Sequence, residues 1–489
     1  MRKALVTGVS AVAMILSGCG GSNTGGVAPP VQVTPTPTPP STPTPPPTSG
    51  CSLSERKQFA LSAIQEWWLF APQDLAANVN PASYATVQEY IDALVAPARA
   101  QGKDRYFTYI TSIAEENAYY NSGSTAGFGV RFTYDTTARR MFVAEAFEGA
   151  PALNAGIDRG TEILAIGTSA GNLRNVSDII AAEGTAGVTN ALGPSDVGVT
   201  RVLRVRDPNG TTREVSVAKA DYTLQAVSPR YGAKVIDNNG TRVGYINLRT
   251  FIDNAETPLR QAFANFRAQG ITQVVIDFRY NGGGLVRIGD LMGDLLGGNR
   301  STNDVLSRTV FRPEKASNNS TRYFRPQAES ISPTRVAFIG FGGTASASEL
   351  VINSQIPYLG NNMALVGGNT YGKPVGQIAL DRAACDDRMR VIAFATENSA
   401  GQRDYYNGLA GKVPNSCRAS DDITYPLGDP RESSLRTALD FLAGRACTPI
   451  ADAGVGTLST RQSYGGSELI NNLRGERPST AARENPGAF

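Results

Sequence analysis

The first regular pattern of hydrophobic and polar positions is helical and begins just after residue 50. Apolar residues recur there at helical spacing, and Ser54 can cap the helix. The residues on this face are Phe59, Leu61, Ile64, Trp67 and Trp68. A second helix is predicted over residues 86–96, because apolar side chains again fall on one face. We therefore expect a helical region over residues 51–107.

Short strands and turns replace the helices over residues 108–224. Gly127, Phe128 and Gly129 form a Gly-aromatic-Gly loop before an alternating strand. Residues 148–167 then predict a turn, a short helix that a glycine ends, and a strand. This part of the chain is expected to be a small β-domain.

Strands and helices alternate over residues 225–447, a pattern typical of an α/β domain. The expected strands are 242–251, 271–278, 335–340, 375–381 and 388–395. The expected helices are 259–270, 285–296 and 349–356. Residues 448–489 form a polar tail with one candidate helix at 467–474.

The start of the chain has the pattern of an export signal. Arg2 and Lys3 precede an apolar stretch over residues 4–16, which is too short for a stop-transfer helix. Residues 16–19, Leu-Ser-Gly-Cys, resemble a bacterial lipobox. On this interpretation residues 1–18 are a signal peptide and Cys19 carries a lipid that anchors the protein to a membrane. A plain secretory signal with a nearby cysteine is the alternative.

The expected location is the bacterial cell envelope. Gly20 follows Cys19 where an acidic residue would indicate inner-membrane retention, so we expect the outer membrane, facing the periplasm or the exterior. Residues 19–50 form a Pro/Thr-rich linker that favours an extended polyproline II stalk. The tract could instead be a ligand for a proline-binding module.

The composition excludes several classes of function. The 489 residues include 46 Lys and Arg against 43 Asp and Glu, and this net charge of +3 gives no indication of nucleic-acid binding. The chain has no histidine. This excludes Ser-His-Asp and Cys-His enzymes as well as histidine-ligated metal sites. Acid–base chemistry must use Lys, Asp, Glu, Tyr or Cys.

Four cysteines remain after Cys19, an even number that predicts two disulfides in an exported protein. Three pairings are possible. We expect Cys385 with Cys417, because they are close in sequence, and Cys51 with Cys447, because they bracket the folded part. A four-thiolate metal site is the alternative, although no CxxC spacing supports it.

Three segments of the α/β part could carry chemistry. Residues 277–284 end a buried strand in three glycines, which let backbone N–H groups approach a ligand. Residues 343–349 place small residues in a strand-to-helix turn, where a serine hydroxyl is exposed at a helix N-terminus. Residues 370–377 contain a lysine between glycines. Without histidine, a Ser-Lys pair remains available, because burying a lysine lowers its pKa and frees the amine.

The β-domain resembles a PDZ domain over residues 150–167, although Thr161 stands where the family pattern has Asp. The resemblance implies that the N–H groups of Gly127, Phe128 and Gly129 bind the carboxylate of a peptide C-terminus. The peptide then adds as a strand. A β-domain with only a packing role is the alternative.

Residues 52–446 resemble the C-terminal processing peptidases, or tail-specific proteases, and the related tricorn protease. The resemblance implies that Ser346 is the nucleophile, Lys373 the general base and Gln377 the residue that orients the lysine. Backbone N–H groups of Gly283 and Ala347 are the implied oxyanion donors. Three departures from the pattern are Thr344 for Ser, Gly282 for Pro and a slightly longer spacing between serine and lysine.

The implied fold is a multidomain α+β protein. It comprises a helical N-terminal segment, a PDZ-like β-domain and an α/β catalytic domain of the ClpP/crotonase-like kind. The implied activity is serine-type cleavage of polypeptides, recognised through their C-terminal end, without metal or organic cofactor. Ser348 and Glu349 are interpreted as helix-start residues and Asp277 as a structural acid at a strand end. Arg279 and Asn281 could orient the glycine loop.

Two alternatives stay open. One is a catalytically lapsed lipoprotein that bears a PDZ domain and binds peptides or lipids. The other is a Ser-Lys esterase.

Overall fold

The computed structural model describes residues 50–451. The signal segment, Cys19, the Pro/Thr-rich linker and the candidate helix at 467–474 lie outside these residues. No helix in the described part of the chain is both long and apolar enough to cross a membrane.

The N-terminal helical region consists of α1 (Leu53–Trp67), α2 (Val87–Leu94) and α3 (Ala96–Ala100). The N-cap of α1 is Ser52, so the prediction of Ser54 was wrong. The Ser52 hydroxyl accepts from the Glu55 N–H at 3.3 Å, and the Glu55 carboxylate accepts from the Ser52 N–H at 3.0 Å. This reciprocal capping box satisfies two backbone donors, which Ser54 inside the helix could not do.

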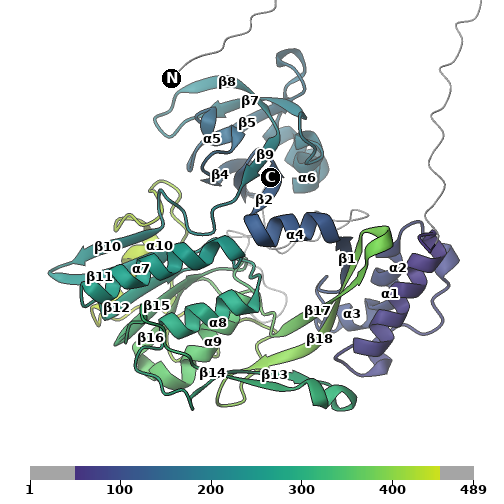
Figure 1. Cartoon of the computed structure of the whole chain (residues 1–489). Coiled ribbons are helices and arrows are strands. Elements are labelled where there is room, and N and C mark those ends of the chain that lie inside the picture. The colour runs from purple at the N-terminus through teal and green to yellow at the C-terminus, as the bar shows by residue number, and fades with distance from the viewer. Residues whose placement is uncertain (1–49, 452–489) are drawn as a thin grey trace, which may run out of the picture. The chain divides into compact units, whose positions relative to one another are not determined.

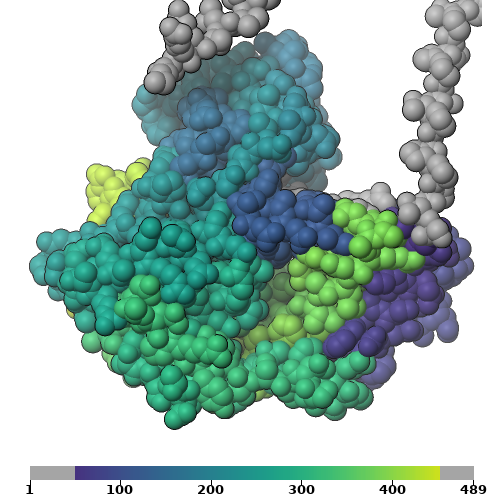
Figure 2. Space-filling model, viewed as in Figure 1, coloured from purple at the N-terminus to yellow at the C-terminus, as the bar shows by residue number. Residues whose placement is uncertain are grey.

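The helical region packs on a hairpin that begins at residue 375, far along the chain. Strands β17 (Val375–Arg382) and β18 (Asp387–Glu397) form this hairpin. Figure 2 shows the N-terminal helices in purple against the light-green hairpin, and the two share one apolar cluster. β18 also pairs with β13 (Val305–Phe311), which pairs with β14 (Ser320–Tyr323).

Residues just after 108 join this same sheet instead of the β-domain. Strand β1 (Tyr109–Ser112) is antiparallel to β18, with Tyr109 opposite Arg390. Helix α4 (Ile113–Ser122) follows it and ends at Gly123. The paired strands of the β-domain therefore begin at Ser124.

The β-domain is built around one antiparallel sheet with its own apolar core (Figure 1). Its strands, in the order β3-β4-β5-β7-β8, are β3 (Val130–Asp135), β4 (Arg140–Ala146), β5 (Glu162–Gly167), β7 (Thr200–Arg206) and β8 (Thr212–Ala218). The short β6 (Arg174–Asn175) pairs with β5, and β2 (Ser124–Gly127) pairs with β9 (Ala220–Thr223). Helices α5 (Pro151–Asn154) and α6 (Val176–Leu192) complete the domain. β3 stands at the end of the strand order, and β4 is its one pairing partner among the described strands.

A mostly parallel sheet carries the three chemistry segments. Its order is β10 (Ala233–Asn238), β11 (Thr241–Asn247), β12 (Gln273–Asp277), β15 (Arg335–Gly340), β16 (Met363–Gly367) and β19 (Ser416–Arg418). One face packs on α7 (Glu256–Ala268), α8 (Val286–Leu295) and α9 (Ala347–Leu359), and the other on α10 (Ser433–Leu442). Val274 and Ile276 lie in the first core and Val275 in the second, which explains the continuous apolar run of this strand.

Both disulfides are present, but the predicted pairing was wrong. The bonds join Cys51 to Cys385 and Cys417 to Cys447, with Cα–Cα distances of 5.5 and 5.3 Å. Cys385 lies in the turn of the β17–β18 hairpin, beside the start of α1. Cys417 lies in β19 and Cys447 follows α10, which packs against that strand. Tertiary contacts, and not closeness in sequence, decide both pairs.

Replacing Cys417 and Cys447 together with serine is expected to lower the free energy of unfolding by about 3–4 kcal/mol, because the bond closes a loop of 30 residues. Denaturant unfolding of this double variant and the parent measures the loss. Non-reducing peptide mapping should recover both observed pairs, and a peptide linking Cys385 to Cys417 would contradict them.

Candidate active site

The three chemistry segments meet because their strands are neighbours. β12, β15 and β16 run parallel and adjacent, and each is followed by one of the segments. The carboxyl ends of parallel strands share one edge of a sheet, where ligands of such folds bind. Residues 282–284, 343–349 and 370–377 therefore converge on one place.

Ser346 occupies the turn between β15 and α9. Its backbone has φ 56° and ψ −115°, a conformation that favours glycine. The side chain is partly exposed, whereas its neighbours Ala345 and Ala347 are buried. Gly283 lies directly against it: a Cβ on Gly283 would stand 2.7 Å from the Ser346 Cβ. Only glycine fits at 283, which explains that part of the glycine run.

The two implied oxyanion donors differ in whether the N–H already has an acceptor. Ala347 is the first residue of α9, so its N–H has no acceptor within the helix. The Gly283 N–H donates to the Asn281 side-chain oxygen at 2.9 Å, so this donor is engaged. Asn281 also donates to the Leu248 carbonyl at 2.9 Å, and its own carbonyl accepts from the Ser348 hydroxyl at 3.0 Å. Asn281 therefore orients the glycine loop, a point on which the sequence was undecided.

Lys373 and Gln377 make the contact that the resemblance implies. The lysine Nζ donates to the Gln377 Oε1 at 3.0 Å and lies 5.0 Å from the centroid of the Phe107 ring. The Gln377 amide nitrogen donates to the Phe107 carbonyl, which fixes the orientation of the amide. Phe107 thus supports the lysine from the helical region, a role that sequence reasoning missed.

Glu349 ties the serine turn to the lysine loop. It is fully buried in α9, and one carboxylate oxygen accepts from the N–H groups of Ser346 at 3.0 Å and Lys373 at 2.7 Å. The other oxygen accepts from the Gly372 N–H at 2.7 Å and the Thr370 hydroxyl at 2.6 Å. Burial raises the pKa of Glu349, although these donors favour the carboxylate. Glu349 lies in the first turn of α9, as the sequence predicted. The prediction was incomplete, because the carboxylate also binds the backbone of the lysine loop.

Thr344, one of the departures from the family pattern, leaves the serine turn intact. The Thr344 hydroxyl donates to the Phe278 carbonyl at 2.7 Å and accepts from the Phe341 N–H at 3.0 Å. A serine hydroxyl could make the same bonds, so threonine is an acceptable replacement.

Asp277 pairs with Arg279 at 2.8 Å, and both side chains are fully buried. This contact fits a structural acid.

A buried ion-pair cluster joins the β-domain to the glycine loop. Arg159, which precedes β5, donates to the Tyr280 hydroxyl at 2.8 Å and to Asp421 at 2.7 Å. Tyr280 itself donates to Asp421, and Arg279 binds Asp421 at 2.8 Å and Glu432 at 2.9 Å. Burial raises the pKa of Asp421, but the two guanidinium groups lower it more, so the net pKa is below its usual range. Tyr280 precedes Asn281, so this cluster fixes the base of the glycine loop.

The Gly-aromatic-Gly loop lies between β2 and β3. Gly129 has a positive φ of 74°, and a Cβ there would stand 1.9 Å from the Ala150 Cβ. The N–H groups of Phe128 and Gly129 have no hydrogen-bond acceptor within residues 50–451. Lys219 places its Nζ 4.8 Å from the Phe128 ring centroid, and burial lowers the pKa of this lysine to about 8. Its Nζ donates to the carbonyls of Gly193 at 2.8 Å and Pro194 at 2.7 Å.

No group of three or more acidic, cysteine or histidine side chains that could hold a metal ion occurs among the described residues. The four cysteines in this part of the chain are all in disulfides, which rules out the four-thiolate alternative.

The chain is similar in sequence to known peptidases. Residues 242–399 match peptidase family S41. The chloroplastic C-terminal processing peptidase of Tetradesmus obliquus is 28% identical over 277 residues, which cover 53% of this chain and 54% of that protein. A carboxyl-terminal-processing protease of Picosynechococcus sp. is 27% identical over 383 residues, covering 77% of this chain and 84% of that protein. The match thus spans about half of the algal relative and most of the cyanobacterial one.

A solved structure shares the fold. The crystal structure of a protein assigned as an S41 protease from Bacteroides fragilis superposes with a TM-score of 0.59 at 20% identity. The match covers 79% of this chain and 97% of that one. Over residues 242–399 the chain thus matches peptidase family S41, the serine peptidases with a Ser-Lys dyad, and over most of its length it is similar to a C-terminal processing protease.

Proposed function

We propose that this protein is an endopeptidase of the tail-specific type, which cleaves polypeptides with Ser346 as nucleophile and Lys373 as general base. The observation that carries the proposal is the Glu349 carboxylate, because it binds the backbone of both residues and so holds the two motifs together. Gln377 holds the lysine amine. Glu349 and Gln377 together thus fix the backbone of both proposed reacting residues and the amine of Lys373.

The mechanism follows from these positions. The neutral Lys373 amine takes the Ser346 hydroxyl proton while the oxygen attacks the scissile carbonyl. The Ala347 N–H faces the developing oxyanion at the start of α9, where the helix dipole favours negative charge. The Gly283 N–H joins it once it exchanges the Asn281 oxygen for the oxyanion. Lys373 then protonates the leaving amine, and water releases the acyl group from Ser346.

A fluorophosphonate probe tests the nucleophile. The full chain should be labelled at Ser346, and the Ser346→Ala variant should be neither labelled nor able to cleave casein. Turnover of small esters without any cleavage of casein or denatured protein would favour the esterase alternative. Absence of both labelling and turnover in the intact protein would favour the lapsed binding protein.

The β-domain is proposed to capture the C-terminal end of the substrate as a PDZ domain does. Within residues 50–451 the N–H groups of Phe128 and Gly129 have no acceptor, Lys219 lies over the Phe128 ring, and β3 pairs with β4 on one side. These are the parts that a carboxylate-terminated strand requires.

Amidating the C-terminus of a peptide ligand is expected to weaken its binding about tenfold or more, because the loop N–H groups lose a charged acceptor. Fluorescence anisotropy of matched acid and amide peptides on the Ser346→Ala protein measures the difference without cleavage. Equal affinities would leave the β-domain with a packing role.

Export and lipid anchoring at Cys19 are proposed from residues 16–19, with the disulfides as support, because these bonds persist in oxidising compartments. The Cys19→Ser variant is expected to remain unprocessed or to leave the membrane fraction. Fractionation and mass spectrometry of the N-terminal peptide test this. A processed Cys19→Ser protein that stays membrane-bound would contradict the anchor.

A further inference from the structure

Arg105 reaches the lysine loop from the segment between α3 and β1. One terminal nitrogen of its guanidinium donates to the carbonyl of Tyr371 at 2.8 Å, to that of Gly372, and to that of Tyr406 at 3.1 Å. Gly372 directly precedes Lys373. These hydrogen bonds therefore hold the backbone that carries the proposed base.

The positive charge of Arg105 is met by neutral groups. Its three acceptors are backbone carbonyls, and its Nε is buried without a hydrogen bond. Its guanidinium carbon lies 4.3 Å from the centroid of the Tyr371 ring and 5.9 Å from that of the Phe107 ring. Within residues 50–451 no carboxylate forms an ion pair with Arg105. Its charge therefore acts on neighbouring titratable groups without a counter-ion.

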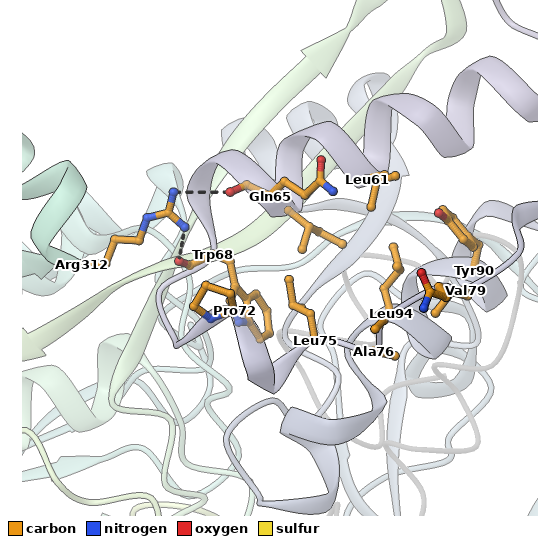
Figure 3. A pocket seen from close by; sticks show the side chains of 13 residues that line it. Leu61, Gln65, Trp68, Pro72, Leu75, Ala76, Val79, Tyr90, Leu94 and Arg312 are labelled. Atoms are coloured by element: carbon orange, nitrogen blue, oxygen red, sulfur yellow. Dashed lines mark hydrogen bonds between the residues drawn. The ribbon is translucent and has the colours of Figure 1, made fainter.

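Lys373 shares the Phe107 ring with Arg105. The lysine Nζ lies 5.0 Å from the centroid of this ring. Phe107 belongs to the apolar cluster of the helical region, and Figure 3 shows Trp68 and Leu94 of that cluster. Apolar surroundings screen charges less than water does, so the two cations repel each other. A cation beside an amine disfavours the ammonium form of that amine.

The turn around Arg105 is fixed by its neighbours. Tyr106 has a positive φ of 65°, which is costly for a non-glycine residue. The Asp104 carboxylate accepts from the Phe107 N–H at 2.6 Å, and the guanidinium carbon of Arg99 lies 4.0 Å from the Tyr106 ring centroid. A strained backbone persists where the surrounding structure enforces it. These contacts therefore fix the place from which Arg105 extends to the lysine loop.

Other titratable groups border the lysine loop, namely Glu349, Asp104, Tyr371, Tyr405 and Tyr406. Burial raises the pKa of the three tyrosines, so their phenols stay neutral around neutral pH. Burial also raises the pKa of Asp104 and Glu349. An ionised carboxylate at either position favours the ammonium form of Lys373 and opposes Arg105. Both acids are the same in every variant below, so they produce no difference between the variants.

We propose that Arg105 is a positioning residue for Lys373, whose loop it holds by hydrogen bonds and whose ammonium form it disfavours by its charge. More of the lysine amine is then neutral and able to accept the Ser346 proton. Arg105 acts through Lys373 and needs no contact with the substrate. The inference rests on the proposed Ser346–Lys373 dyad.

The pH dependence of serine activation tests this inference. Arg105→Gln removes the charge, whereas Arg105→Lys keeps it. The rate constant of fluorophosphonate labelling and kcat/KM for peptide cleavage are measured against pH for the full chain and both variants. In Arg105→Gln the midpoint of the rise should move up by about half a pH unit or more, so labelling at neutral pH becomes about threefold slower or more.

Two further features of the profiles separate charge from loop geometry. The Arg105→Gln rate should approach the parent rate at the alkaline plateau, because the amine is neutral in both proteins there. Arg105→Lys should keep a midpoint closer to that of the parent. Arg436→Gln, the same change at an exposed arginine of α10, is the matched control and should leave the profile unchanged. Melting curves establish that each variant is folded, and Arg105→Met is a second variant without the charge.

Several results would overturn the proposal. A folded Arg105→Gln protein with the parent midpoint would do so even if its rate were lower at every pH, because that pattern indicates a purely structural contact. An equal shift in Arg105→Lys would contradict the role of the charge. Failure of both Arg105→Gln and Arg105→Met to fold would assign Arg105 a structural role instead. A parent protein that is neither labelled nor active would refute the dyad itself, and this inference with it.

Discussion

Replacing Lys373 with arginine is expected to lower kcat/KM by about 10³-fold or more, nearly as far as Ser346→Ala. The side chain stays long and cationic, but a guanidinium does not lose its proton in a protein. Arginine therefore cannot accept the Ser346 proton, even if its nitrogens reach Gln377. Peptide cleavage and fluorophosphonate labelling should fall together, because both require the activated serine.

The control is Lys412→Arg, the same change at an exposed lysine, which should leave the rate unchanged. In the parent enzyme the rate should rise with pH as the Lys373 ammonium loses its proton. Chelators should have no effect. An active Lys373→Arg enzyme, or activity that EDTA removes and zinc restores, would refute the proposed dyad.

Replacing Glu349 with glutamine is expected to lower kcat by about 10²-fold or more and the free energy of unfolding by about 2–4 kcal/mol. The carboxylate accepts four hydrogen bonds, two at each oxygen. An amide replaces one oxygen with an NH₂ group, which then faces two donors in a fully buried position. Either the serine turn or the lysine loop must move.

Steady-state kinetics and thermal unfolding of the same preparation test this. Glu349 acts through the backbone of Ser346 and Lys373, so kcat should fall in protein that is still folded at the assay temperature. Glu256→Gln, at a 42% exposed side chain in α7, is the matched control. A Glu349→Gln enzyme with the parent kcat would show that the bridge is dispensable.

The predicted strand at 271–278 and the predicted helix at 285–296 correspond to β12 and α8. Strand β12 has only five residues, but its Val and Ile content favours a strand. Strand β16 is equally short and went unrecognised, because periodicity cannot assign its apolar run, which includes Met, Ala and Leu, to strand or helix. β13 and α10 were also missed.

For the proposed site, the sequence named Ser346, Lys373 and Gln377, and the structure brings their segments together through hydrogen bonds. Phe107 was missed because it supports Gln377 with a backbone carbonyl, which every residue type has, across 270 positions. The prediction of the disulfide pairing was wrong for a related reason, because the pairing depends on which loops the folded sheets bring together. Contacts of this kind cannot be predicted from local residue patterns.

The backbone of Ser346 makes a side chain at this position costly for the stability of the fold. A non-glycine residue at φ 56° and ψ −115° costs about 1–3 kcal/mol, which glycine at the same position would largely avoid. The proposed catalytic use of the Ser346 hydroxyl therefore exchanges part of the free energy of folding for function.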